Sequence, residues 1–236
     1  MPTISIIIPT LNEATNIQRL LPHLQQYGQG KIKEIIVSDG GSNDGTLNFA
    51  KDLGAMTHQA ATSGRGAQLA AAAALASSEI LYFVHADTIP PSSYVQDIHD
   101  ALDRGYDFGC YRYRFDSTQL VLKINAWFTR FPFMWCRGGD QSLFITRTFY
   151  DKIGGFDATQ NIMEDFDIIL RGKKQGGRFR IMPKNVLVSD RKYHYNSYLR
   201  VNIANLIIFN MWRLGYEPAT LKRTYYKLIR HPKNAT

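Results

Sequence analysis

Residues 34–46 read EIIVSDGGSNDGT, and this stretch is the most informative one for predicting the fold. The β-branched run at its start predicts a strand, and the glycines and aspartates from Asp39 onward predict a polar loop where the strand ends. Helical spacing over residues 47–53 follows. The same unit precedes it, because ISIII at residues 4–8 is followed by helical spacing over residues 14–24. Repeated units of strand, loop and helix predict a parallel sheet with crossover helices.

A third unit lies further along the chain. Gly-Arg-Gly at residues 64–66 opens an Ala-rich helix over 67–76, which leads into an apolar strand over 80–84 and then into HADT at 85–88. In an open α/β sheet, ligands bind at the carboxyl ends of the strands. We therefore expect the three polar loops to surround one pocket.

Composition restricts the class of protein. The 236 residues are 44% hydrophobic and 20% charged, which fits one globular domain with a sizeable core. The net charge of +8 favours phosphate-bearing ligands, nucleic acid or an anionic membrane surface as partners. Nucleic acid is disfavoured because the basic residues are scattered and no recognised reading motif accompanies them.

The cysteines and the apolar runs bear on location. Cys110 and Cys136 match no metal-ligand spacing and are too few for a disulfide framework, so buried thiols in a reducing compartment are expected. The chain starts with a strand-like run instead of a basic leader, and it has no apolar span of the roughly 18 residues that a membrane helix needs. We expect a cytoplasmic protein that does not cross a membrane.

Two common nucleotide-binding motifs are absent. Residues 64–69, GRGAQL, begin like a dinucleotide fingerprint but have Leu69 where the third glycine belongs. Neither glycine-rich loop continues into the Lys-Ser/Thr pair of a P-loop. What remains is a set of carboxylates, Asp39, Asp87 and Glu164-Asp165. Taken singly, each also fits a turn, a helix cap or a first-turn acid facing a helix dipole.

The order of these pieces is more specific. Over residues 3–192 the chain resembles the family 2 glycosyltransferases with the GT-A fold. The resemblance rests on five ordered pieces: IIPTLNE at 7–13, VSDGGSNDGT at 37–46, HAD at 85–87, GGF at 154–156 and ED at 164–165. More narrowly, GRGAQ at 64–68, the His-Ala-Asp-Thr form and GDQ at 139–141 look like a subgroup of small, single-domain bacterial members.

The resemblance implies a Rossmann-like α/β domain whose mostly parallel sheet is flanked by helices. One domain would cover residues 1–236, with a nucleotide-sugar half at 1–90, an acceptor and catalytic half at 91–195, and a C-terminal helical segment at 196–236. The implied activity is inverting, metal-dependent transfer from a UDP- or GDP-sugar to an acceptor hydroxyl. A sugar-phosphate nucleotidyltransferase and a non-catalytic, membrane-docked binding module are the alternatives.

The donor side of the site follows from the same resemblance. The first loop would border the nucleoside, and the Asp39 carboxylate would accept a hydrogen bond from an N–H of uracil or guanine. Arg65 would reach the base or the phosphates, and Arg191, followed by Lys192, would close over the diphosphate. The full donor set is Pro9, Thr10, Asn12, Glu13, Asp39, Arg65, His85, Ala86, Asp87 and Arg191.

A divalent cation is the implied cofactor. The family often has Asp-x-Asp where this chain has His85-Ala86-Asp87, so Asp87 is expected to hold Mn²⁺ or Mg²⁺ against the diphosphate. His85 would contact the ribose or act as a borderline ligand, and an imidazole suits Mn²⁺ better than Mg²⁺. His194 is a weaker metal or phosphate candidate, and an ordinary surface or packed histidine is the alternative there.

The acceptor side follows from the second half. By resemblance Asp165 is the base that takes the acceptor hydroxyl proton, with Glu164 orienting it, and helix capping is the alternative. Direct displacement at the anomeric carbon predicts inversion. Gly139, Asp140 and Gln141 would face the sugar or the acceptor, with a plain turn as the competing interpretation.

Two aromatic, amphipathic stretches complete the pattern. Residues 120–131 place six large apolar side chains on one helical stripe, and residues 198–214 form a second apolar segment with a narrow polar line. We expect core packing for both. The alternative is that one stripe lies in a bilayer interface and positions a lipid-linked acceptor, which would make the protein peripheral at the inner face of the membrane.

Overall fold

Among the residues that the structure describes, eight strands form one sheet in the order β3-β2-β1-β4-β7-β6-β8-β5. The computed structural model describes residues 2–61 and 64–230. The strands are β1 Ile4–Thr10, β2 Ile32–Asp39, β3 Met56–Gln59, β4 Ile80–Phe83, β5 Thr88–Ile89, β6 Phe108–Phe115, β7 Leu143–Thr146 and β8 Phe179–Val188. The strand pairings make β1, β2, β3, β4, β6 and β8 run in one direction, and only β5 and β7 run against them. The predicted α/β fold with a mostly parallel sheet is confirmed.

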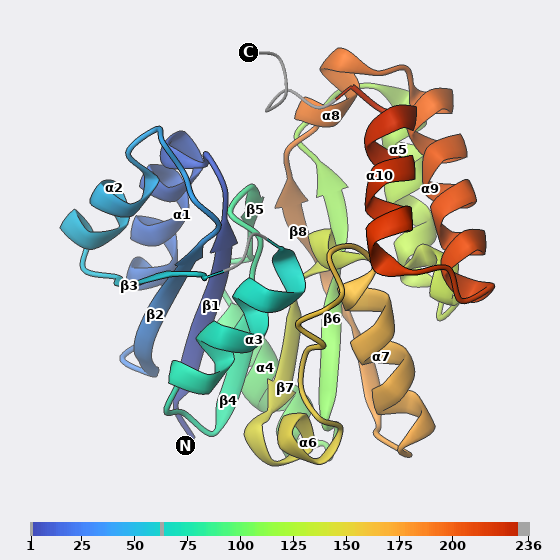
Figure 1. Cartoon of the computed structure of the whole chain (residues 1–236). Helices are drawn as coiled ribbons and strands as arrows, with labels where there is room; N and C mark the ends of the chain where they lie inside the picture. Colours follow the sequence, from blue (N-terminus) through green and yellow to red (C-terminus); the bar gives the residue numbers. More distant parts are fainter. Residues whose placement is uncertain (1, 62–63, 231–236) are drawn as a thin grey trace.

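Helices cover both faces of the sheet (Figure 1). On one face the buried residues of α1 Ala14–Gln26, α2 Thr46–Asp52 and α4 Tyr94–Asp103 share a core with Ile4, Ile6 and Ile8. On the other face those of α3 Arg65–Leu75, α6 Arg147–Lys152 and α7 Glu164–Lys174 share a second core with Ile7 and Ile36. Alternate β1 residues therefore enter opposite cores, which is why this strand is an uninterrupted apolar run.

The register of β1 and β2 brings the first two loops together. Thr10 pairs with Asp39 at the carboxyl ends of the two parallel strands. The loops that follow are then joined by hydrogen bonds, from the Asn12 amide N–H to the Ser42 hydroxyl and from the Glu13 amide N–H to the Thr46 hydroxyl. The glycine- and aspartate-rich stretch at 39–46 and the first loop thus lie together at the carboxyl ends of the parallel strands.

The second half adds a helical layer beside β6 and β8. It contains α5 Leu120–Trp127, α8 Arg191–Tyr195, α9 Tyr198–Arg213 and α10 Pro218–Leu228, together with the 3-10 turns η1 Phe128–Arg130, η2 Met134–Cys136 and η3 Gly139–Gln141. The side-chain amide of Asn196 ties the start of α9 to the end of α10, because it accepts from the Arg230 amide N–H and donates to the Arg230 carbonyl, each at 2.8 Å. Residues 231–236 of the predicted C-terminal segment lie outside the described residues.

The prediction that the aromatic stretch at 120–131 packs in the core is wrong. Five of its six stripe residues are 39% to 69% exposed, and the buried residues of α5 are Leu122 and Ala126 instead. On α9 the stretch behaves in two ways. Val201, Ala204 and Ile208 are buried, whereas Leu199 and Ile203 are more than half exposed. Helical spacing correctly identified the helices, but it could not say which neighbour, if any, covers each apolar side.

Two smaller expectations can be compared with the structure. Cys110 and Cys136 are free, buried thiols, and burial raises the pKa of each. In the part of the chain that the structure describes, no helix combines the length and the apolar character needed to span a bilayer.

Candidate functional site

A cavity of about 690 Å³ opens at the carboxyl ends of β1, β4 and β8. Most of the residues predicted to form the site line it: Pro9, Thr10, Glu13, Arg65, His85, Ala86, Asp87, Gly139, Asp140, Asp165 and Arg191. These residues come from six separate segments of the chain. The structure therefore brings most of the predicted donor residues, two of the three metal candidates and the predicted base to one cavity.

His85 stands between two carboxylates of this cavity. Its Nδ1 lies 3.5 Å from Oδ1 of Asp140, and its Nε2 lies 4.0 Å from Oδ2 of Asp165. Burial disfavours the charged imidazole, but the carboxylates of Asp140 and Asp165 together outweigh it and raise the pKa of His85. Glycine at position 139 of η3 allows the turn to lie this close to His85 and Asp165, because a Cβ on Gly139 would overlap both the His85 ring and the Asp165 carboxylate.

Two overlapping groups of side chains could hold a metal ion. One consists of His85, Asp87 and Asp140 and the other of His85, Glu164 and Asp165, and within each group the ligand atoms lie within 4.8 Å of one another. The first group fits a hard divalent cation better, since it offers two partly open carboxylates, whereas Glu164 is buried against a guanidinium. Burial and the neighbouring Asp140 raise the pKa of Asp87 even though the Arg191 guanidinium lies nearby, so a bound cation would add charge compensation that this carboxylate needs.

The Glu164-Asp165 pair opens α7. Glu164 is 1% exposed, and its Oε1 lies 3.0 Å from Nη1 of Arg65 at the start of α3. This ion pair, opposed by burial, raises the pKa of Arg65. Burial and then the adjacent Glu164 raise the pKa of Asp165 to about 7. A carboxylate with that pKa is suited to accept a proton near neutral pH.

Arg191, at the start of α8, joins two of the strand-end loops. Its Nη2 lies 3.0 Å from Oε1 of Glu13 and 3.7 Å from Oδ2 of Asp87. The guanidinium therefore sits beside the candidate metal ligand and faces the same cavity. Arg65 also lines the cavity, with about half of its side chain exposed, so two cations are available to an anionic ligand.

Two predicted donor residues shape the loops behind the cavity wall. Asp39 is fully buried, and its carboxylate accepts from the Thr10 hydroxyl and from the amide N–H groups of Gly41 and Ser42. Asn12 has φ +52° and accepts from the Asn43 amide N–H. The hydrogen bond from a base to Asp39 stays a prediction, and in this structure the side chain holds the turn.

Gln141 and His194 differ from the other predicted residues. Gln141, the last residue of η3, is fully buried, and neither polar atom of its side-chain amide has a hydrogen-bond partner among the described residues. His194 does not line the cavity: its side chain is 60% exposed and pairs with Asp190 at 3.0 Å. The structure therefore supports the alternative interpretation, in which His194 is an ordinary surface histidine, and it gives no support to a metal contact there.

Strained backbone conformations occur next to several of the site residues. Among the described residues four that are not glycine have φ between +51° and +68°, namely Asn12, Gln29, Ser142 and Met163. Three of them directly neighbour Glu13, Gln141 and Glu164. Strained backbone that clusters in this way is typical of functional sites.

Sequence reasoning missed the polar wall on the far side of the cavity. The Tyr113 hydroxyl donates to Oδ1 of Asn125 at 2.6 Å, and the side-chain amide of Asn125 donates to the Tyr198 hydroxyl at 3.4 Å and to Oδ1 of Asn202 at 3.2 Å. All four residues line the cavity. The positions are spread over 90 residues, and only the polar line on residues 198–214 hinted at them.

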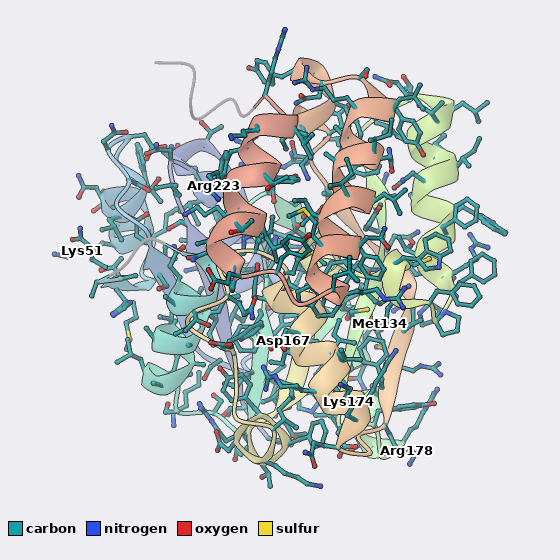
Figure 2. All side chains as sticks on the ribbon, turned by 45° about the vertical axis from the view of Figure 1, so that its right-hand side comes forward. Lys51, Met134, Asp167, Lys174, Arg178 and Arg223 are labelled. Atoms are coloured by element: carbon teal, nitrogen blue, oxygen red, sulfur yellow. The ribbon has the colours of Figure 1, made fainter. Side chains whose placement is uncertain are left out.

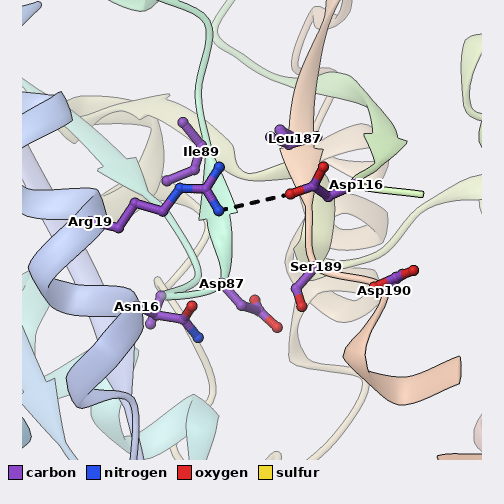
Figure 3. Close-up of a pocket in the computed structure, with 9 residues that line it drawn as sticks. Asn16, Arg19, Asp87, Ile89, Asp116, Leu187, Ser189 and Asp190 are labelled. Carbon is purple, nitrogen blue, oxygen red and sulfur yellow. Dashed lines mark ion pairs between the residues drawn. The ribbon is translucent and has the colours of Figure 1, made fainter. Parts of the chain in front are cut away.

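A small second cavity of about 100 Å³ lies beside Asp87 (Figure 3). Asn16, Arg19, Asp116 and Ser189 contribute to its lining, and Arg19 pairs with Asp116 at 3.8 Å. Both partners of this ion pair are about 60% exposed, so the pair contributes little to stability. Asp87 thus has open space on two sides.

Comparison with known proteins gives a match to the family described as "Glycosyl transferase family 2" over residues 5–156. Glycosyltransferase AglE of Haloferax volcanii is 44% identical over 55 residues, which are 22% of this chain and 18% of that protein. Glucosyl-3-phosphoglycerate synthase of Mycobacterium tuberculosis is 31% identical over 97 residues, which are 38% of this chain and 30% of that protein. The matched stretches thus span less than a third of either relative.

Solved structures match over most of the chain. The mannosyltransferase PcManGT from Pyrobaculum calidifontis, in complex with GDP-Man and Mn²⁺, has a TM-score of 0.68 at 20% identity and covers 95% of this chain and 68% of its own. TarS of S. aureus has a TM-score of 0.64 at 17% identity and covers 96% and 70%. The M. tuberculosis synthase with Mn²⁺, UDP and glucosyl-3-phosphoglycerate has a TM-score of 0.60 at 20% identity and covers 87% and 79%. At these identities the likeness is one of fold, and it agrees with the fold predicted from the sequence.

Proposed function

This chain belongs to the family 2 glycosyltransferases, and we propose that it transfers a sugar from a UDP- or GDP-sugar to an acceptor hydroxyl with inversion. The observation that carries the proposal is the convergence of Asp87, Asp140 and Asp165 around His85 in one cavity. The reported complexes of two fold relatives, one with GDP-Man and Mn²⁺ and one with UDP and Mn²⁺, support this donor class and this cofactor.

Asp87 and Asp140, with His85 between them, would hold Mn²⁺ or Mg²⁺. When bound, the cation supplies neutralisation of the charge that develops on the departing nucleoside diphosphate. Arg191 adds a fixed positive charge beside Asp87, and Arg65 adds a second at the start of α3. We assign these two arginines to the diphosphate side of the donor, as the sequence predicts for Arg191.

Asp165 would be the base. The acceptor oxygen forms the new bond to the anomeric carbon, the bond from that carbon to the diphosphate oxygen breaks, and the hydroxyl proton passes to the Asp165 carboxylate. Glu164, fixed by Arg65, orients the first turn of α7. Attack on the side opposite the leaving group inverts the configuration of the anomeric carbon.

The acceptor would approach Asp165 along the wall formed by Asn125, Tyr198 and Asn202. Three exposed apolar side chains, Phe128, Trp135 and Leu206, also line the cavity. This mixture of an apolar rim and a polar wall supports an acceptor that joins an apolar chain to a hydroxyl-bearing head, so we propose a lipid-linked acceptor and a peripheral position at the inner face of the membrane.

The test is the release of UDP and GDP from a panel of nucleotide-sugars with Mn²⁺, with water or added alcohols as acceptors. Asp165→Asn should lower release about 100-fold or more and leave donor binding intact, because only the base is removed. Asp167→Asn is the matched control, since it lies on the same helix, pairs with Arg171 and does not line the cavity. Full release by Asp165→Asn would remove the proposed base.

A further inference from the structure

Large apolar side chains gather on one exposed part of the molecule. Nineteen of them are exposed among the described residues, and thirteen fall within residues 120–135 and 199–216. We define the aromatic-cationic face by its most exposed members on α5, the following turns and α9: Leu120, Val121, Ile124, Trp127, Phe128, Phe133, Trp135, Leu199, Ile203 and Leu206. Figure 2 shows Met134 beside ring side chains that project from this edge of the molecule.

The two helices present these side chains as one surface. Asn125 on α5 donates to Asn202 on α9 at 3.2 Å. Val121 and Phe128 lie one helical turn before and after Asn125, and Leu199 and Leu206 lie one turn before and after Asn202. The exposed apolar residues therefore flank the contact between the helices on both sides, so the two stripes adjoin.

The segments that carry the face also carry positive charge without any acid. Residues 120–135 and 199–216 contain four Lys and Arg residues and none of the 20 acidic residues. Lys123, Arg130, Arg200 and Arg213 are exposed, and none of the four pairs with a carboxylate of the described residues. The Arg130 guanidinium instead lies 4.6 Å from the centre of the Trp127 ring.

This charge pattern selects the occupant of the face. A second copy of the chain bound through the same surface would bring like charges together with almost no acid to pair them. An anionic bilayer matches both the apolar and the cationic side chains of the face. Aromatic rings and aliphatic side chains enter the headgroup boundary, and Lys and Arg contact lipid phosphates. We propose that the aromatic-cationic face docks this protein on an anionic lipid surface.

The face is continuous with the active-site cavity. Phe128, Trp135 and Leu206 belong to both, and Asn125, which makes the contact between the helices, also lines the cavity. A docked protein would thus turn its acceptor wall toward the bilayer. This step rests on the proposed function, and it names the place from which a lipid-linked acceptor enters: the membrane side of α5 and α9.

Vesicle flotation of the full chain tests the docking without any donor or acceptor. The protein should float with vesicles that contain phosphatidylglycerol and remain unbound with vesicles of phosphatidylcholine alone. Replacing Leu120, Ile124 and Phe133 together by Ser should lower binding at least about tenfold, because three apolar groups no longer enter the boundary. Lys123→Gln and Arg213→Gln should each lower it about fivefold.

Matched controls lie elsewhere on the surface. Met56→Ser with Leu75→Ser removes two apolar side chains of similar exposure from β3 and α3, and Lys51→Gln removes a cation labelled at the opposite edge in Figure 2. None of these changes should alter vesicle binding. All variants should keep the melting temperature and the stabilisation by nucleotide with Mn²⁺ of the unchanged protein, because none of the replaced residues lines the cavity.

Equal binding to neutral and anionic vesicles, binding to neither, or equal losses in the face and control variants would overturn the docking. A concentration-dependent dimer that the Leu120, Ile124 and Phe133 variant abolishes would identify a second copy as the occupant instead. Flotation and nucleotide release fail independently: docking without release would leave the face intact and remove the proposed activity, and release without docking would do the reverse.

Discussion

Gly139 shows how much of the site depends on one missing side chain. A Cβ at this position would overlap the His85 ring and the Asp165 carboxylate, which lie 4.0 Å apart in the lining of the cavity. We expect Gly139→Ala to lower kcat/KM about 100-fold, because displaced groups lose their reacting geometry. The measurement is nucleotide release together with the melting temperature.

Gly138 is the control for that substitution. Its φ is 168°, which is extended backbone open to any residue, and a Cβ there would meet nothing within 4 Å among the described residues. Gly138→Ala should therefore keep its activity. Equal losses in both variants would mean that backbone freedom of the turn, and not the overlap at Gly139, explains the result.

The pH dependence of the reaction follows from Asp165. Burial and the adjacent Glu164 raise the pKa of this carboxyl to about 7. Only the deprotonated form accepts a proton, so kcat/KM should rise as the pH increases through about 7 and then level off, and a bound cation nearby would move the midpoint lower. Measured at saturating Mn²⁺, a rate that falls over this interval would contradict the assignment, and Asp165→Asn should lack the rising limb.

At the scale of elements, Glu34 ties three of them together. Its carboxylate on β2 accepts from the Ser5 hydroxyl on β1 at 2.5 Å and from the Ser77 amide N–H beyond α3 at 2.7 Å. Partial burial opposes ionisation, but these hydrogen bonds outweigh it and lower the pKa of Glu34. The stabilisation is therefore present above the ordinary glutamate pKa and is lost as the pH falls through the lowered value in the folded protein.

We accordingly expect Glu34→Gln to lower the free energy of unfolding by about 1 kcal/mol at neutral pH. The difference from the unchanged protein should shrink in acid, where the native carboxyl is itself protonated. Urea unfolding at neutral and at acidic pH measures both values. A loss that is the same at every pH would show that size and shape at position 34, and not charge, matter there.

Elements with strong local signals were predictable. The strands around residues 4–8, 34–38 and 80–84 are apolar runs whose core contacts come from both faces, and the helices between them carry periodic apolar residues. β3 was not predicted, because MTHQ is mostly exposed and becomes a strand only by pairing with β2 at the edge. β5 is two residues long and depends in the same way on β8.

At the scale of the whole molecule, motifs predicted many of the residues that line the cavity but not which contacts they make. Arg65 pairs with Glu164 and Arg191 with Glu13, and the partners stand 99 and 178 positions apart in the chain. Such pairs depend on the way the sheet and α8 close the cavity. The exposed side of α5 is a similar case, because its apolar stripe looks the same in sequence whether a core or another surface covers it.

The proposed sugar transfer requires metal-dependent binding of a nucleotide at Asp87 and Asp140. Isothermal titration of UDP and GDP, each with and without Mn²⁺, against the unchanged chain and against Asp87→Asn measures this most directly. We predict that one of the two nucleotides binds tightly only when Mn²⁺ is present, and that Asp87→Asn loses this binding while it keeps its melting temperature. Affinity that is the same without the metal, or unchanged in Asp87→Asn, would contradict the account.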